Sequence, residues 1–277
     1  MTAVQVKVHI PSGTIILNRP ERRNAMSREL LKELLQAFHD LHQERRVRAV
    51  ILTGSGSAFC AGMDLAEMQA TAQEPDAQSQ WYNDSVLYSE LIETMLRFPK
   101  PIIAALNGPA IAGGLGLALA SDTVIASPEV KLGLPEPKRG LVAGIVSPLL
   151  AFRVGGGHAS HLLMTGRIVD AREGHRIGIV HELVASDMTW VRANDIAKEC
   201  AESAPEALQL TKRMLYETIG EHLMVQLSAG AAASATARTT EAAVEGLAAF
   251  LEKRSPRSEE HTSELQSLAY LVCRLLL

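Results

Sequence analysis

The stretch from Ile102 to Asp122, IIAALNGPAIAGGLGLALASD, most constrains what this chain can fold into. Ile102 to Leu106 is a short uncharged run with β-branched residues, which predicts a buried strand. Asn107-Gly108-Pro109 then predicts a turn. Leu115 to Ala120 carries no polar side chain, and a helix that is apolar on every face lies in a protein core. The chain is therefore expected to build its fold around a buried strand, turn and helix.

Two glycines, Gly113 and Gly114, precede this apolar helix, and they allow two interpretations. Without side chains they let another backbone or a ligand approach closely. The free N–H groups and the dipole at the start of a helix also favour a negatively charged oxygen. The alternative is that the glycines only allow tight packing of a core helix. The stretch alone leaves both open.

The composition excludes several classes of protein. The chain has 277 residues, of which 47% are hydrophobic, enough for one large domain or one domain with a small appendage. A net charge of −4 does not indicate the basic surface that a nucleic-acid-binding protein needs. No apolar run reaches the ~18 residues of a membrane span, and the N-terminus lacks a signal-peptide pattern. Three scattered cysteines, Cys60, Cys200 and Cys273, argue against a disulfide framework or zinc site. We expect a cytoplasmic protein that contacts neither membrane nor nucleic acid.

The order of patterns predicts an α/β chain. Strands are expected at Val4 to His9, Thr14 to Leu17 and Ala49 to Thr53, with a leucine-rich helix after the N-cap residue Ser27. Strands and helices alternate over roughly the first 185 residues, and only helical patterns follow.

The segment before the opening stretch divides into two parts. Gln69 to Asp84 is polar and weakly patterned, so a mobile segment is expected there. Ser85 to Phe98 has helical spacing, and Pro99 ends it.

A glycine-rich loop from Gly54 to Gly62 lies between a predicted strand and a helix expected to begin at Leu65. A phosphate-binding P-loop requires Gly-Lys-Ser/Thr, and the loop has no lysine. The dinucleotide fingerprint requires a third glycine where Phe59 stands. Nucleotide binding is therefore disfavoured. The segment around Ser147 lacks the GxSxG motif, so a serine-nucleophile hydrolase also has little support.

Two polar features have structural as well as functional interpretations. Glu136 lies between two prolines and close to Lys138 and Arg139, and a charged loop residue is commonly a solvated partner of such bases. His158 and His161 are three residues apart, but a metal site needs a third ligand that the pattern does not supply. We expect no metal site.

Three segments together resemble the crotonase superfamily, the enoyl-CoA hydratases and isomerases. The resemblance covers about residues 4 to 256, and its specificity lies in the order and spacing of motifs that are weak individually. The three segments are Asn24 to Ser27, Ser57 to Leu65, and Asn107 to Asp122; Gly133 to Glu136 and Leu163 to Gly166 add to them.

The resemblance implies an α/β fold, a crotonase-like spiral of ββα units with a C-terminal helical region. It implies that residues 1–195 form the spiral core with the active site and that residues 196–256 form a helical oligomerisation region. A homotrimer or homohexamer is expected. The implied substrate is an acyl-CoA thioester, and no separate cofactor is implied.

The resemblance also implies roles for individual residues. The backbone N–H groups of Met63 and Gly113 map to the oxyanion hole, which stabilises negative charge on the thioester oxygen. Glu136 maps to the second of two catalytic glutamates, whereas the first maps to Gly116, which has no side chain. Gln69 to Phe98 is expected to line the acyl pocket. The positions implied in CoA or substrate binding are Arg22, Arg23, Ala25, Ala61, Asp64, Leu65, Gly114 and Gly116.

Three functions remain open at this point. A single carboxylate fits a Δ3,Δ2-enoyl-CoA isomerase, since one group can remove a proton and return it elsewhere. Hydratase-like members acting on branched glutaconyl-type CoA esters also resemble this chain at GGxGL and at Gly144 to Pro148. We therefore favour hydration of a branched or unusual 2-enoyl-CoA. A non-catalytic acyl-CoA-binding protein is the third possibility.

The character of the chain changes after Pro256. Arg257 to Ser267, RSEEHTSELQS, resembles an in-frame translation of a DNA-sequencing adapter, and Leu271 to Leu277 resembles its later constant part. We interpret residues 257–277 as a non-native read-through tail and exclude them from the fold. A natural genomic continuation with the same sequence would contradict this.

Overall fold

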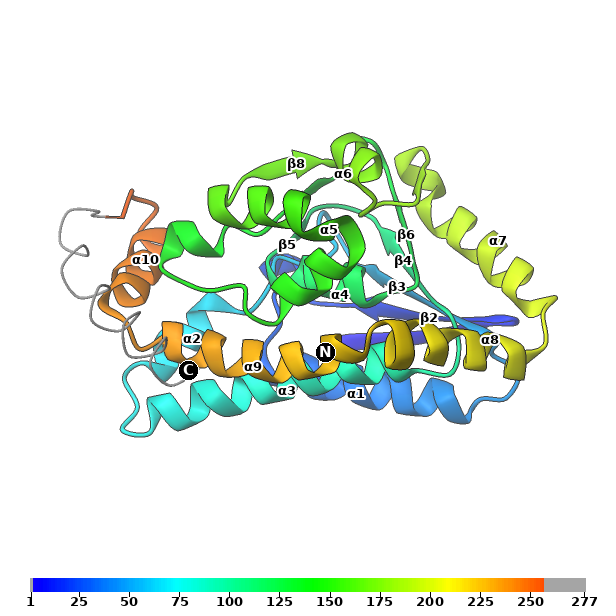
Figure 1. The fold of residues 1–277 in the computed structure, drawn as a ribbon, viewed down its shortest axis with the longest axis horizontal. Coiled ribbons are helices and arrows are strands. Elements are labelled where there is room, and N and C mark those ends of the chain that lie inside the picture. Colours follow the sequence, from blue (N-terminus) through cyan, green and yellow to red (C-terminus); the bar gives the residue numbers. More distant parts are fainter. Residues whose placement is uncertain (1, 257–277) are drawn as a thin grey trace.

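Two β-sheets form the centre of the protein in the computed structural model, which describes residues 2–256 (Figure 1). The interpretation of residues 257–277 as a read-through tail therefore lies outside the described residues. The larger sheet has the order β1-β2-β3-β4-β6-β9, and the smaller has the order β5-β7-β8. The pair β1–β2 is antiparallel and the other pairs of the larger sheet are parallel. The strands are β1 (Val4–His9), β2 (Ser12–Leu17), β3 (Ala49–Gly54), β4 (Ile102–Leu106), β5 (Ala110–Ile111), β6 (Thr123–Ala126), β7 (Lys131–Gly133), β8 (Ile168–Asp170) and β9 (Glu182–Leu183).

Helices follow most strands, and the described chain ends in a run of helices. The helices are α1 (Arg28–Gln43), α2 (Leu65–Thr71), α3 (Ala77–Arg97), α4 (Gly113–Ala120), α5 (Val146–Thr165), α6 (Ala171–Ile177), α7 (Thr189–Ala201), α8 (Pro205–Arg213), α9 (Glu221–Ala237) and α10 (Glu241–Leu251). Short 3₁₀ helices are η1 (Pro20–Arg22), η2 (Glu136–Arg139) and η3 (Ser186–Met188), and Met214–Ile219 forms a π-helix, labelled η4.

The parallel strands are buried on both faces, which explains their continuous apolar sequences. Successive side chains of a strand point to opposite faces. Val50 and Leu52 of β3 accordingly join the main core, whereas Ala49 and Ile51 join a second core. Helix α7 covers this second face and contributes Ile196 to it. The first helix of the C-terminal part thus belongs to the packing of the sheet. Whether the domain boundary lies at residue 195 stays a prediction.

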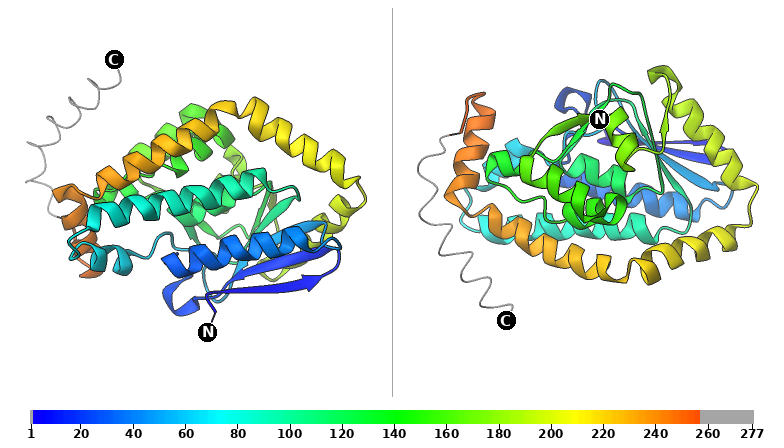
Figure 2. Two further views of the ribbon diagram at one scale, coloured as in Figure 1. Left: turned by 90° about the horizontal axis from the view of Figure 1, so that it is seen from below. Right: turned by 45° about the horizontal axis from the view of Figure 1, so that its top comes forward.

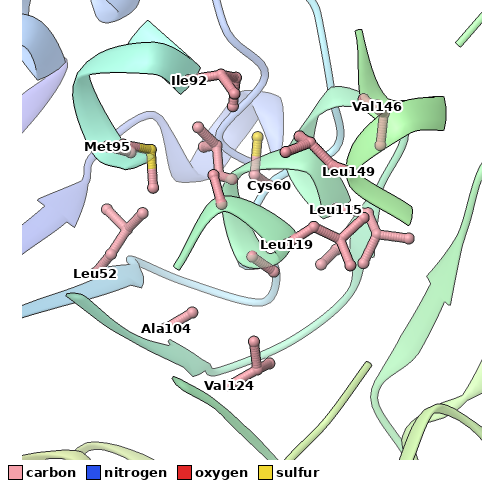
Figure 3. Packing of buried hydrophobic residues seen from close by; sticks show 14 of the residues in the cluster. Leu52, Cys60, Ile92, Met95, Ala104, Leu115, Leu119, Val124, Val146 and Leu149 are labelled. Carbon is pink, nitrogen blue, oxygen red and sulfur yellow. The ribbon is translucent and has the colours of Figure 1, made fainter. Parts of the chain in front are cut away.

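Helix α4 lies inside the main core, as its sequence predicts. All eight of its residues are buried. Figure 3 shows Leu115 and Leu119 of this helix among side chains of α3, α5 and the strands, with Cys60 beside them. The strand before it, β4, is buried at every position. The element that most constrains the sequence is therefore also the centre of the fold.

The C-terminal helices return to cover the first half of the chain. Figure 2 shows α9 alongside α3, and α3 alongside α1, and the contacts between elements agree. Helix α10 packs against η2 and α2. Its packing on η2 is close, because an added Cβ at Gly246 would lie 2.3 Å from the carbonyl oxygen of Arg139. These contacts bring the last helices to the segment that carries Glu136.

The expectation of a mobile segment at Gln69 to Asp84 is wrong. Helix α2 continues to Thr71, and α3 begins at Ala77 rather than at Ser85. Trp81 and Asp84 are buried there, because α9 packs on this part of α3. Polar residues that looked unpatterned in the sequence are thus ordered by tertiary contacts.

Within residues 2–256, no helix is both long enough and apolar enough to span a membrane.

Candidate active site

One cavity collects residues from widely separated parts of the chain. It lies between the segment around Met63, helix α3, the start of α4, the segment from η2 to α5, and the end of α9. Its lining is mostly apolar, with a few polar and charged groups. The lining residues are Ala61, Met63, Leu65, Met68, Ser85, Tyr88, Ala112, Gly113, Glu136, Arg139, Leu141, Val142, Ala143, Gly144, Ile145, Val146, Ser234 and Arg238.

Glu136 is buried in this cavity rather than solvated in a surface loop. Only 8% of the residue is exposed. Within residues 2–256, its Oε2 atom has no hydrogen-bond partner. Burial raises the pKa of the carboxyl to about 7, although a backbone hydrogen bond and the charge of Arg139 act in the opposite direction. A carboxyl with such a pKa can both accept and donate a proton near neutral pH.

The backbone N–H of Met63 is positioned by a bridge between Met63 and Met26. Met26 N–H donates to the oxygen of Gly62 at 2.8 Å, and Asp64 N–H donates to the oxygen of Met26 at 2.9 Å. In a parallel bridge the neighbours of the central residue make the bonds, so the N–H of Met63 faces away from Met26. It is therefore available to another acceptor.

Gly113 is the first residue of α4, and its N–H has no acceptor within the helix. The residue before it, Ala112, has φ 54° and ψ −131°, a conformation that only glycine adopts readily. Gly62 has φ +96°, and an added Cβ there would lie 2.8 Å from the Cβ of Ala112 and 3.4 Å from the nitrogen of Gly113. Two unusual backbone conformations thus bring the Met63 segment against the start of α4.

Gly116 lies one turn further along α4, where Tyr88 leaves no room for a side chain. An added Cβ would lie 2.1 Å from the hydroxyl oxygen of Tyr88 and 3.0 Å from Cγ2 of Val146. The Tyr88 hydroxyl is buried and donates to the oxygen of Gly113 at 2.6 Å. Burial raises the pKa of this phenol well above its usual value. The neutral hydroxyl of Tyr88 therefore occupies the space that the first side-chain carbon of a glutamate at position 116 would need.

The other predicted binding residues do not all reach the cavity. Ala61 and Leu65 line it. Arg22 and Arg23 are exposed on the surface. The remaining positions outside the lining are Ala25, Asp64, Gly114 and Gly116.

Two of these have structural reasons for their residue type. The Asp64 carboxylate pairs with Arg19 at 2.9 Å and caps α2 through the N–H of Ala66. Gly114 packs against backbone, since an added Cβ would lie 2.3 Å from the oxygen of Cys60.

Several lining residues are absent from the predicted set: Tyr88, Arg139 and Arg238, together with the hydroxyls of Ser85 and Ser234. Ser85 and Tyr88 come from the segment that was expected to line an acyl pocket, but nothing in helical spacing distinguishes them from core residues. Arg238 comes from the far end of the chain, and no sequence motif marks it.

A metal site is not formed among residues 2–256, where no three His, Cys, Asp or Glu side chains are grouped so that they could bind an ion.

Comparisons with known proteins identify the family. Residues 13–261 match the sequence profile of the family described as enoyl-CoA hydratase/isomerase. A putative enoyl-CoA hydratase of Thermus thermophilus is 43% identical over 255 residues, which cover 92% of this chain and 99% of that protein. The 2,3-dehydroadipyl-CoA hydratase of Escherichia coli is 32% identical over 243 residues, covering 87% of this chain and 92% of that protein.

Solved structures show the same likeness. The crystal structure of an enoyl-CoA hydratase/isomerase from Xanthobacter autotrophicus Py2 superposes with a TM-score of 0.80 at 33% identity, covering 90% of this chain and 91% of that one. Carnitinyl-CoA hydratase from Mycobacterium avium superposes with a TM-score of 0.80 at 30% identity, covering 94% of this chain and 99% of that one.

The fold is that of the crotonase superfamily, as the sequence motifs implied. The chain belongs to the enoyl-CoA hydratase/isomerase family. It is an enzyme of this type, and its chemistry concerns acyl-CoA thioesters.

Proposed function

We propose that the protein hydrates a branched or otherwise unusual 2-enoyl-CoA, with Glu136 as its single acid–base group. The main support is the position of Glu136, a buried carboxyl with a pKa of about 7 that shares one cavity with Met63 and Gly113. The N–H groups of these two residues form the proposed oxyanion hole. Each such donor is typically worth about 10²–10³ in rate.

One carboxylate is sufficient for a balanced addition of water. Ionised Glu136 removes a proton from water while the water oxygen bonds to the β-carbon. The electron pair of the double bond moves toward the thioester oxygen, where the Met63 and Gly113 amides stabilise the enolate. Protonated Glu136 then gives its proton to the α-carbon and returns to the ionised state. Water has been added, and the carboxylate is regenerated for the next turnover.

Tyr88 occupies the space of the missing first glutamate in this scheme. Its hydroxyl hydrogen is engaged by the oxygen of Gly113, so the oxygen can still accept a hydrogen bond from water. The high pKa of the phenol keeps it neutral, and it therefore cannot replace a carboxylate as a base. We assign Tyr88 a positioning role.

Double-bond isomerisation is the second candidate, and the side-chain-free position 116 favours it. Glu136 would remove a proton from one carbon and return it to another, with the same enolate between the two steps. Both reactions use the same residues, so the products must distinguish them.

A panel of purified CoA esters tests the proposal. We expect loss of the 2-enoyl absorbance with formation of a 3-hydroxyacyl-CoA, and faster turnover of 3-methylglutaconyl-type esters than of straight-chain 2-enoyl esters. A 3-enoyl-CoA should not react faster than these. Migration of the double bond without uptake of ¹⁸O from labelled water would instead establish isomerisation. No turnover of any ester would support the non-catalytic alternative.

We also propose that the CoA moiety leaves the cavity toward the segments around Ala25, Ala61 and Leu65. Exposed Arg22 and Arg23 lie on the same segment as Ala25 and can meet phosphate groups there. Asp64 and Gly114 act through the backbone they hold in place. Replacing both arginines with alanine should raise the KM for a good substrate and leave kcat unchanged. An unchanged KM would contradict the assignment.

The apolar surface of the last helices supports the proposal of a homotrimer or homohexamer. Met214, Ile219 and Val225 are 62%, 71% and 71% exposed. Their sequence neighbours Leu210 and Leu215 are also exposed, and such patches on a single chain commonly mark an interface. Sedimentation equilibrium should therefore give three or six times the chain mass. A monomer at micromolar concentration would contradict the assignment.

A further inference from the structure

A buried arginine that no proposed step uses lies in the wall of the cavity. Arg238 follows the last residue of α9, and only 7% of it is exposed. Among residues 2–256 its guanidinium makes one hydrogen bond, from Nη1 to the backbone oxygen of Trp81, at a long 3.3 Å. Most of its five N–H donors are therefore unused, and the residue lines the cavity.

Asp84, the carboxylate that acts on Arg238, forms no ion pair with it, because Asp84 is already bound by Arg28. Asp84 accepts two hydrogen bonds from Arg28, at 2.6 Å from Nε and 2.9 Å from Nη2. Within the described chain, Arg238 forms no ion pair of its own. Asp84 thus acts on two guanidinium groups, Arg28, which it binds directly, and Arg238, with which it forms no ion pair. Glu67 and Asp76 also act on Arg28.

Burial makes the unpaired charge of Arg238 costly. Desolvation lowers the pKa of Arg238 to about 10, with Asp84 opposing the change and Arg28 adding to it. The guanidinium remains charged at neutral pH. A buried charge is ordinarily paired, and an unpaired one is a strong indication of a missing counter-ion.

The cavity around Arg238 indicates what kind of anion it takes. The serine hydroxyls there donate to backbone oxygens, Ser85 to Trp81 at 3.0 Å and Ser234 to Val142 at 3.3 Å. The guanidinium is therefore the main free donor on this wall. The same cavity also holds Glu136 and has apolar lining, supplied by residues such as Leu141 and Val146. A short apolar chain that ends in a carboxylate matches this arrangement, because a guanidinium binds a carboxylate through two parallel hydrogen bonds.

We propose that Arg238 binds a carboxylate at the far end of the acyl chain, so that the substrate is the mono-CoA thioester of an unsaturated dicarboxylic acid. This inference rests on the proposed function, since it places the enoyl group at Glu136 and the carboxylate at Arg238. Arg139 is a less suitable receptor, because its guanidinium stacks on the ring of Phe250 at 4.1 Å and lies close to Glu136.

Binding of unreactive saturated esters tests the inference separately from catalysis. Glutaryl-CoA and valeryl-CoA have acyl chains of equal length, and only the first ends in a carboxylate. Calorimetry should show that the wild-type protein binds glutaryl-CoA about 10- to 100-fold more tightly, the range expected for hydrogen bonds to a charged group. Arg238→Met should remove this difference while it leaves the affinity for valeryl-CoA unchanged. Arg238→Lys should retain part of it.

Controls keep these outcomes distinct. Arg213→Met removes an exposed arginine of the same helical region and should not change the ratio of affinities. Equal binding of both esters by the wild-type protein would overturn the inference, and this comparison needs no variant. An equal loss of affinity for both esters in a folded Arg238→Met protein would also overturn it, since Arg238 would then hold the CoA moiety. A preserved preference for glutaryl-CoA with no hydration of any enoyl ester would refute the proposed function and not the carboxylate site.

Discussion

Replacing Glu136 with glutamine should lower kcat/KM for the best enoyl-CoA substrate by about 10²–10⁴-fold, the range for loss of a general acid–base group. The upper part of this range is expected because Glu136 handles the proton in both steps. The wild-type rate should rise with pH, reach half of its maximum near pH 7, where burial places the pKa of this carboxyl, and level off above about pH 8. Glutamine preserves the size of the side chain, so substrate binding should change little.

Glu129→Gln is the matched control, because Glu129 is exposed and pairs with Arg172 at the surface. Its activity should equal that of the wild type at every pH. Full activity of the Glu136→Gln variant would refute the acid–base role of Glu136.

The Glu136→Gln variant should be more stable than the wild type above neutral pH. The pKa of about 7 in the folded state lies above the ordinary glutamate value of 4.5, so between these values the folded state binds more protons than the unfolded state. Stability contributed by this group is therefore lost as the pH rises from about 4.5 to 7. This difference between the folded and unfolded pKa values corresponds to about 3 kcal/mol of unfolding free energy at most. Urea unfolding should show Glu136→Gln more stable at pH 8, with the gap shrinking toward pH 5.

A single methyl group at position 116 should destabilise the protein by about 1–3 kcal/mol, the usual cost of overpacking a core. Gly116→Ala places its Cβ 2.1 Å from the hydroxyl oxygen of Tyr88. In a Tyr88→Phe background that oxygen is absent, and the nearest remaining atoms are Cγ2 of Val146 at 3.0 Å and Cζ of the ring at 3.3 Å. The cost of Gly116→Ala should therefore fall below about 1 kcal/mol in that background.

Gly156 provides the control for this double-mutant cycle. It also lies in a helix, but an added Cβ there would meet nothing within 4 Å, so Gly156→Ala should be neutral. Equal costs of Gly116→Ala with and without the Tyr88 hydroxyl would contradict the close contact. A glutamate at position 116 is expected to need a smaller residue at position 88 for the same reason.

The sequence could predict the elements whose patterns are local. The apolar run of α4, the strand β4 and the start of α2 at Leu65 required only neighbouring residues. The family motifs also indicated Glu136, Met63 and Gly113, which the structure brings to one cavity. The roles assigned to these three residues remain proposals.

Features that depend on distant contacts were not visible in the sequence. The first two turns of α3 carry polar residues with weak periodicity, and α9 orders them from more than a hundred residues away. Glu136 has the local sequence of a solvated turn, and its burial is supplied by other segments. The roles of Tyr88 and Arg238 depend on their surroundings in the fold. Tyr88 lies against Gly116, and Arg238 lines the cavity without an ion-pair partner in the described chain.

The packing of α10 on η2 has a consequence for the order in which the enzyme matures during synthesis. Glu136 leaves the ribosome before Arg238, which lines the same cavity, and before Gly246, which packs on the backbone of Arg139. The cavity that holds Glu136 therefore includes residues from both halves of the chain and is complete only after the later ones have been synthesised.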